Sequence, residues 1–422
     1  MPRGQNTPEG SWVPTQDEVL ELIRKEAREG ARRILQAALE AEVEEHVKQF
    51  SELTDANGHQ TVVRNGHAPP RSIETGVGSL EVRRPRVDER RAKQQNPKHG
   101  EFTSAVLPKF MRRTPTFDGS LATLYLLGVS TNDFPKALRS LLGDEVDNIS
   151  ATTITRIKHQ WQAEYDQWRQ SKLTDSEYAY LWADGIYFNV RLDEERSCIL
   201  VVVGANYNGE KKLLALQDGY RESKQSWKEA LMSLKHRGLT VDPKLVIGDG
   251  GLGLWAALPE VFETSTTQRC WVHKTANVLD KMPKSVQGRA KKMIHDIYMA
   301  DTKDNAEAAF DHFVSVFEDK YPKATECLAK DREALMSFYR FPAKHWQHIR
   351  STNVIESVFA TVRLRTKKTK GCGSREATLA MTFKLIEEAQ KTWRKLQGWQ
   401  KLQLVRENRR FVDGDLVEES VA

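Results

Sequence analysis

Three acidic residues stand in contexts where a carboxylate needs a cation. Asp184 lies within the run Tyr-Leu-Trp-Ala-Asp-Gly-Ile-Tyr-Phe, where an unpaired buried carboxylate would be costly. Asp249 ends the run Leu-Val-Ile-Gly-Asp, and ligands of open α/β sheets bind at the carboxyl ends of strands. Glu356 lies at the edge of an apolar helical stripe. Together these oxygen donors would suit two Mg²⁺ or Mn²⁺ ions, which can promote phosphoryl displacement.

Each acid also has an ordinary structural explanation when it is taken alone. Asp184 could turn out to solvent in a bulge, and the Asp249-Gly250 pair is common in turns. Asn353 and Glu356 have the spacing of a helix capping box. The combination favours a metal site, because three carboxylates brought together repel one another unless cations neutralise them.

The elements needed to bring the acids together can be inferred from periodicity. Strand patterns cover residues 178–191, 198–207, 212–216, 244–248 and 267–272, and a helical pattern covers 223–235. Residues 274 to about 339 are helical throughout, and further helices are expected at 352–365 and 376–396. This order predicts an α/β fold: an RNase H-like catalytic core, with a mixed sheet flanked by helices and an all-α insertion before the last catalytic helix.

The preceding chain is predicted to be mainly helical and to bind DNA. Residues 17–50 have the spacing of an amphipathic helix with a break at Gly30, and a basic, loop-rich stretch follows with a hairpin around 76–87. Helices at 120–127, after the capping sequence 130–133, and at 150–168 fit a helix-turn-helix, in which Arg156 and Lys158 would face DNA. A plain helical bundle is the alternative.

We therefore expect five segments. They are an N-terminal helical and basic DNA-binding region (1–115), a helix-turn-helix-like domain (116–175), the first part of the core (176–273), the all-α insertion (274–345), and the last core helices with a basic C-terminal region (346–422).

A basic run without acids follows Glu356. It comprises Arg363, Arg365, Lys367, Lys368, Lys370 and Arg375. A solvated loop is one interpretation, and contact with DNA phosphates is the other, favoured beside a nuclease site.

Cys270 and His273 form a CxxH element. They could supply half of a zinc site with His345 and His348. Packing, or contact with DNA near the active site, is the interpretation that we favour.

Four segments of the chain resemble the bacterial mutator-type insertion-sequence transposases. They are residues 183–187, 248–250, 269–277 and 351–357, the last followed by 360–365. The resemblance extends from about residue 17 to about residue 410. It implies a DDE triad at Asp184, Asp249 and Glu356, with an all-α insertion before the glutamate. It also assigns Cys270 and His273 to the family's CxxH element, and Arg363 to its basic residue seven positions after the glutamate.

The expected function is that of a DNA transposase. Two Mg²⁺ or Mn²⁺ ions would support cleavage at terminal inverted repeats and strand transfer of the freed 3′-hydroxyl into target DNA. The resemblance further implies a homodimer or larger assembly on double-stranded DNA ends, with a circular intermediate as one route. The alternatives are a domesticated transposase that binds DNA without catalysis, and an RNase H-like nuclease or resolvase without strand transfer.

Composition sets broader limits. The chain has 64 basic and 58 acidic residues, so its net charge of +6 is only weak evidence for a nucleic-acid partner. Its amino-terminal segment has no apolar core of a secretory signal, and its densest apolar run, 198–203, is too short to span a bilayer. Four scattered cysteines form no CxxC pair. We therefore expect a cytoplasmic protein without disulfides or membrane contact.

Overall fold

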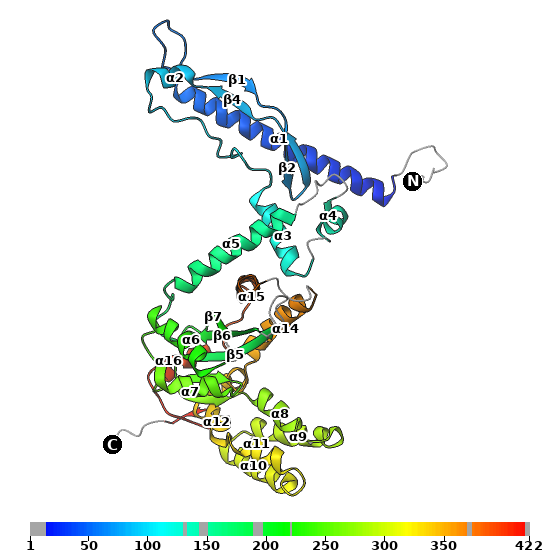
Figure 1. The fold of residues 1–422 in the computed structure, drawn as a ribbon, viewed down its shortest axis with the longest axis vertical. Coiled ribbons are helices and arrows are strands. Elements are labelled where there is room, and N and C mark those ends of the chain that lie inside the picture. Colours follow the sequence, from blue (N-terminus) through cyan, green and yellow to red (C-terminus); the bar gives the residue numbers. More distant parts are fainter. Residues whose placement is uncertain are drawn as a thin grey trace. The chain divides into compact units, whose positions relative to one another are not determined.

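The computed structural model describes residues 14–129, 133–142, 151–188, 197–219, 222–368 and 374–417 (Figure 1). The chain forms two compact units, Met1–Ile154 and Thr155–Ala422.

The first unit combines helices with two small antiparallel sheets. Its elements are α1 (Gln16–Gln49), β1 (Val63–His67), β2 (Arg71–Thr75), β3 (Gly78–Val82), β4 (Pro85–Asp88), α2 (Arg90–Gln95), α3 (Pro115–Leu126) and α4 (Phe134–Leu142). Strands β2 and β3 form a hairpin, whereas β4 pairs with β1. The hairpin predicted around residues 76–87 therefore lies earlier in the chain, at 71–82. The strand that follows Arg83 and Arg84 is β4, which pairs with β1 and not with β3.

Helix α1 is continuous, so the predicted break at Gly30 was wrong. A capping box between Thr15 and Glu18 starts the helix, and one interior glycine costs only about 1 kcal/mol relative to alanine. The residues that α1 buries are not those of the expected apolar stripe: Ile23, Ala27 and Ile34 of that stripe are exposed, and the buried residues are Leu39 and Val43 in the C-terminal half. Leu39 packs there against Ile73 and Val82 of the hairpin, whereas several apolar residues of the N-terminal half, such as Ile23, are exposed.

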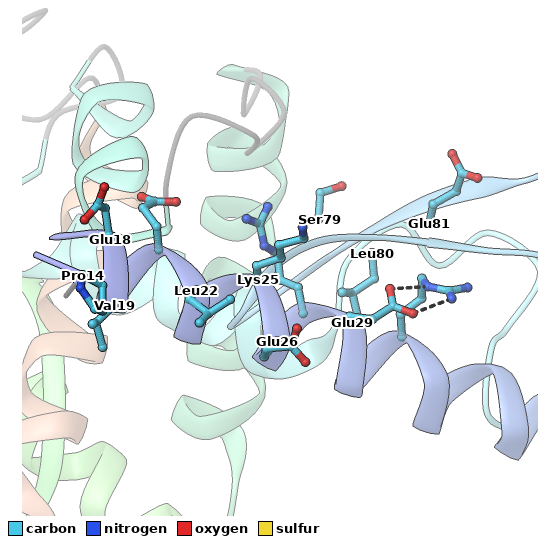
Figure 2. Close-up of a pocket in the computed structure, with 13 residues that line it drawn as sticks. Pro14, Glu18, Val19, Leu22, Lys25, Glu26, Glu29, Ser79, Leu80 and Glu81 are labelled. Atoms are coloured by element: carbon cyan, nitrogen blue, oxygen red, sulfur yellow. Dashed lines mark hydrogen bonds and ion pairs between the residues drawn. The ribbon is translucent and has the colours of Figure 1, made fainter. Parts of the chain in front are cut away.

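A pocket of about 750 Å³ lies along the exposed half of α1, where that helix faces β3 (Figure 2). Its lining is rich in charge, and part of that charge is neutralised within the helix, as in the Arg32–Glu29 pair (Nη2 to Oε1, 2.7 Å). The pocket belongs to the first unit, and none of the site residues predicted from the sequence lines it.

Helices α3, α4 and α5 (Ala151–Gln170) occur close to the positions predicted for the helix-turn-helix. Helix α3 begins earlier than predicted, because Thr114 caps it and Pro115 occupies its first turn. Of the predicted capping sequence, residues 130–132 lie outside the described residues. Arg156 is exposed and Lys158 is partly exposed on α5. DNA binding by these helices stays a prediction.

The second unit is built on a five-stranded sheet in the order β7-β6-β5-β8-β9. Its strands are β5 (Tyr180–Phe188), β6 (Ser197–Ala205), β7 (Lys211–Gly219), β8 (Leu245–Gly248) and β9 (Thr266–Arg269). Strands β5, β6 and β7 form an antiparallel meander, whereas β8 runs parallel to β5 and β9 runs parallel to β8. The unit is therefore a mixed α/β structure, as the strand patterns predicted.

Two helices bury the sheet's main core. Helix α6 (Lys224–His236) contributes Trp227 and Leu231, and α7 (Leu252–Val261) contributes Leu258, to a cluster with Leu181 and Val202 of the strands. Helix α6 was predicted, but α7 was not. Strand β9 also ends earlier than predicted, because the chain turns at Cys270 into a helix.

Helices make up most of the remainder of the second unit, as predicted for residues 274–339 and 352–365. They are α8 (Trp271–Leu279), α9 (Lys284–Met299), α10 (Lys303–Phe317), α11 (Pro322–Ala329), α12 (Arg332–Met336), α13 (Trp346–Ile349), α14 (Asn353–Lys368), α15 (Arg375–Gln390) and α16 (Leu402–Arg406). Short 3₁₀ turns lie at Ser337–Arg340, Ala343–His345 and Trp399–Lys401, and a small hairpin joins β10 (Phe411–Val412) to β11 (Asp415–Leu416). The helix predicted at 376–396 ends at Gln390, and α13, α16 and the C-terminal hairpin were not predicted. Among the described helices, none has the length and apolarity needed to cross a bilayer.

Candidate active site

Asp184 and Asp249 stand at the same level of two adjacent parallel strands. The register of β5 and β8 pairs Ala183 with Gly248, and each aspartate is the next residue. Neighbouring strands are separated by about 4.8 Å, so the two side chains begin close together although 65 positions separate them in the sequence. This arrangement gives a physical basis for the predicted convergence of these two acids at one edge of the sheet.

Neither aspartate is matched by a direct cationic partner. The Asp184 carboxylate accepts a hydrogen bond from the Gly185 N–H at 2.8 Å, and the Asp249 carboxylate accepts one from the Gly251 N–H at 2.8 Å. Within the described part of the chain, no side chain forms a hydrogen bond or ion pair with either carboxylate. Asp184 is only 4% exposed, so its charge has lost water without gaining a salt bridge.

The electrostatics of Asp184 follow from this burial. Loss of water raises its pKa to about 7, and the negative charges of Asp249 and Glu222 act in the same direction, while His273 opposes them. Carboxylates that are both buried and mutually repulsive favour a bound cation, because the cation stabilises their charged forms.

Glu356 enters the same site from α14, which lies beside β5 (Figure 1). Its Oε1 is 3.8 Å from Nε2 of His273 and 3.3 Å from the Thr352 hydroxyl. A hydrogen bond with Cys270 raises the pKa of His273 to about 9, and the charges of Asp184 and Asp249 also raise it. His273 is therefore a cation at physiological pH that lies beside Glu356 and is stabilised by the charges of both aspartates.

The capping-box explanation for Glu356 does not match the helix start. Helix α14 begins at Asn353, so Thr352 precedes it and Asn353 is its first helical residue rather than its cap. The Asn353 N–H donates to the Ser351 hydroxyl at 3.4 Å, and the Glu356 carboxylate accepts from the Thr352 hydroxyl instead. Asn353 itself is exposed.

Cys270 fixes the start of α8 against the start of α14. Its buried sulfur accepts hydrogen bonds from the N–H and the hydroxyl of Thr352, at 3.3 and 3.5 Å. The potential ligand atoms of Cys270, His273 and Glu356 lie within 4.8 Å of one another. The CxxH element therefore lies beside Glu356, and its role in packing or in contact with DNA stays a prediction.

The zinc alternative through His345 and His348 finds no support. Both ring nitrogens of His345 are engaged, Nδ1 with the Tyr180 hydroxyl at 2.8 Å and Nε2 with the Gly398 carbonyl at 2.9 Å. His348 Nε2 accepts from the Gln397 N–H at 3.2 Å. Burial lowers the pKa of both histidines to about 4, so each is a neutral packing residue.

Sequence reasoning missed a fourth acid, Glu222, in the turn between β7 and α6. Its pKa is raised by burial and by the charge of Asp249. Its sequence surroundings gave no signal, but Gly185 and Gly251, one close to each aspartate, leave space that the Glu222 carboxylate fills.

The structure describes only part of the basic run that was predicted to contact DNA. Arg363 is exposed on α14, with its guanidinium 5.8 Å from the centre of the Phe359 ring. The side chains of Arg365, Lys367 and Lys368 lie outside the described residues, as does Lys370. Their contact with DNA stays a prediction.

A mixed α/β unit whose sheet edge gathers carboxylates has a donor set that could hold hard divalent cations. The family model described as "Transposase, Mutator family" matches residues 14–396. The chain therefore belongs to the mutator family of transposases.

Three transposases of bacterial insertion sequences illustrate this relationship. The one for element IS6120 of Mycolicibacterium smegmatis is 49% identical over 298 residues, which is 71% of this chain and 92% of the relative. The one for IST2 of Acidithiobacillus ferrooxidans is 43% identical over 66% of this chain and 94% of the relative. The one for ISRM5 of Rhizobium meliloti is 28% identical over 91% of this chain and 92% of the relative.

Proposed function

We propose that the chain is a metal-dependent DNA transposase that cuts the ends of an insertion sequence and joins them to target DNA. Asp184, Asp249 and Glu356 are its catalytic carboxylates, and they hold two Mg²⁺ or Mn²⁺ ions. The observation that carries the proposal is the placement of Asp184 and Asp249 at one level of two parallel strands, where no cationic side chain of the described ranges pairs with either.

The topology supports an RNase H-like core. An antiparallel meander, a helix, a parallel strand, a second helix and a second parallel strand follow one another along the chain. The helical block α8–α12 then separates Asp249 from the helix that carries Glu356, as the proposed all-α insertion.

The residues present fit the ions. Asp184 is buried and forms no ion pair with a described residue, and the aspartates offer carboxylate oxygens, the donors that Mg²⁺ and Mn²⁺ prefer. When bound, the two ions would activate an attacking oxygen and stabilise a leaving oxygen. Asp184 and Asp249 hold the site from the sheet, and His273 positions Glu356 opposite them.

Two in-line displacements at phosphorus account for the reaction. In the first, a water oxygen bonds to phosphorus, the bond to the 3′-oxygen breaks, and that oxygen leaves as a hydroxyl. In the second, this 3′-hydroxyl loses its proton and bonds to a phosphorus of target DNA, whose own bridging oxygen leaves. One set of carboxylates can serve both steps, because the 3′-oxygen that leaves phosphorus in the first step is the oxygen that attacks phosphorus in the second.

The proposed partners are double-stranded DNA with terminal inverted repeats, target DNA, and a second copy of the chain on the other end. The basic run from Arg363 to Arg375 would contact DNA phosphates. We place this activity in the bacterial cytoplasm, where the DNA lies.

The proposal is tested with purified protein, an oligonucleotide that carries one end of the element, a plasmid target and Mg²⁺. We expect both nicked ends and covalently joined products on denaturing gels, and neither product in the presence of EDTA. Binding without nicking would favour a domesticated DNA-binding protein. Nicking without joined products would favour an RNase H-like nuclease or resolvase.

Arg365→Ala is expected to weaken DNA binding at every sequence tested and to flatten its dependence on salt. Each lost phosphate contact lowers the slope of log K against log salt by roughly 0.9. Binding titrations by fluorescence anisotropy at several salt concentrations measure this slope, with Lys320→Ala on the exposed end of the helical block as control. An unchanged slope would remove Arg365 from the phosphate contacts.

A further inference from the structure

Two glycines beside the catalytic aspartates leave room for one additional carboxylate. The Glu222 carboxylate occupies the position where a side chain on Gly185 would begin. A Cβ on Gly251 would lie 2.9 Å from Oε2 of Glu222 and 3.4 Å from Oδ1 of Asp249. Gly185 directly follows Asp184, and Gly251 is two positions after Asp249. Glu222 therefore reaches between the two strands that carry the aspartates.

The backbone holds Glu222 in this position from both sides. Its φ is 51°, a left-handed conformation that non-glycine residues rarely adopt. The next residue, Ser223, caps α6 by accepting a hydrogen bond from the Ser226 N–H at 3.1 Å. A Cβ on Gly253 would collide with the Glu222 carbonyl oxygen, so the turn packs directly against the first turn of α7. A strained residue fixed by its surroundings is typical of functional sites.

Glu222 has polar neighbours but no countercharge in contact. Its Oε1 lies 3.8 Å from the Cys198 sulfur, and its carboxylate also accepts from the Tyr187 hydroxyl. Across the described ranges no lysine, arginine or histidine forms an ion pair with Glu222. Asp184, 4% exposed, likewise has only a main-chain donor. Three carboxylates thus converge without a direct cationic partner, which is unfavourable unless a cation binds among them.

We propose that Glu222 is a fourth metal-binding carboxylate of the catalytic centre and that it binds the divalent cation shared with Asp184 and Asp249. The inference rests on the proposed function, because it adds a ligand to the same metal site. It also gives Gly185, Gly251 and Gly253 one common role, since a side chain at any of them would displace the Glu222 turn or its carboxylate.

The test measures Mn²⁺ binding to the full chain in the absence of DNA. Electron paramagnetic resonance of the free ion gives the affinity of the wild type, Glu222→Gln and Glu229→Gln. Glu229 is the matched control, because it is exposed on α6, where its carboxylate accepts a hydrogen bond from the Gln225 side chain at 2.7 Å. Replacing a residue that only supports a metal ligand already weakens metal affinity 10–100-fold. We therefore expect at least a roughly 10-fold weaker Kd for Glu222→Gln, and no change for Glu229→Gln.

A second readout separates a ligand from a structural residue. Glutamine keeps the hydrogen-bonding capacity of Glu222 but removes a repulsive charge. Without metal, the unfolding temperature of Glu222→Gln should equal or exceed that of the wild type. With Mn²⁺, the variant should lose most of the rise in unfolding temperature that the wild type shows. Gly185→Ala should give the same loss, because its methyl group takes the place of the carboxylate.

Asp184→Asn separates a failure of the proposed active site from a failure of the proposed role of Glu222. If Asp184→Asn loses Mn²⁺ binding while Glu222→Gln keeps wild-type affinity, the role of Glu222 is overturned and the proposed active site stands. If the wild type binds no Mn²⁺, or if Asp184→Asn binds it normally, both the proposed active site and the role of Glu222 are overturned.

Discussion

Asp184→Asn is expected to abolish DNA cleavage and strand transfer while leaving DNA binding intact. The amide replaces an anionic group with a neutral one at the most buried of the proposed metal ligands, which is 4% exposed. Replacing a residue that only supports a metal ligand commonly lowers metal affinity or activity 10–100-fold. We therefore expect cleavage to fall by more than about 100-fold when a ligand itself is replaced. Cleavage of a labelled DNA end in Mg²⁺, followed on denaturing gels, measures the loss.

The same variant also distinguishes a functional acid from a structural one. Because Asp184 is desolvated and lies near two other carboxylates that raise its pKa, removal of its charge should leave the unfolding temperature of the metal-free protein unchanged or higher. Asp319→Asn, at an exposed turn after α10, serves as the control that should keep full activity. A lower unfolding temperature for Asp184→Asn, or substantial residual cleavage, would contradict the assignment.

The sequence alone could place Asp184 and Asp249 together, because Asp184 lies within one strand pattern, Asp249 ends another, and the predicted order of elements brings both acids to one edge of the sheet. It could not locate Glu222. An acid in a polar turn has no local signature, and its importance arises only from Gly185 and Gly251, which are 37 positions before it and 29 positions after it.

Two other differences between the predicted and the observed elements, at α7 and at the end of β9, also have specific causes. Helix α7 carries Gly253 and Pro259, which weaken a helical pattern, yet burial of its leucines against the sheet stabilises it. The apolar residues Cys270 and Trp271 extended the predicted strand β9, although they begin α8. There the Cys270 sulfur accepts a hydrogen bond from the N–H of Thr352, which lies on a distant segment of the chain. Such contacts between remote segments are absent from any local window of sequence.

Asp331→Ala is expected to destabilise the second unit by about 3 kcal/mol, the lower end of the cost of breaking a buried ion pair. Asp331 neutralises two buried cations. It forms an ion pair with Lys274, which is fully buried, and its Oδ2 lies 3.3 Å from Nε of Arg269, which is 5% exposed. The alanine variant removes this countercharge from both cations, and Lys274 Nζ keeps the Cys327 carbonyl, 2.7 Å away, as an acceptor. Urea unfolding followed by circular dichroism measures the change.

The effect of Asp331→Ala should also reach the proposed metal site. The Arg269 guanidinium packs against Gly250, at the point where a side chain would begin, and Gly250 has a φ of +86° directly after Asp249. An Arg269 released from Asp331 no longer holds this turn, so Mn²⁺ should bind more weakly to the folded variant. Asp319→Ala, which removes an exposed acid, should change stability by less than about 0.5 kcal/mol. If Asp331→Ala is destabilised but keeps wild-type Mn²⁺ affinity, the ion pairs stabilise the fold and do not position Asp249.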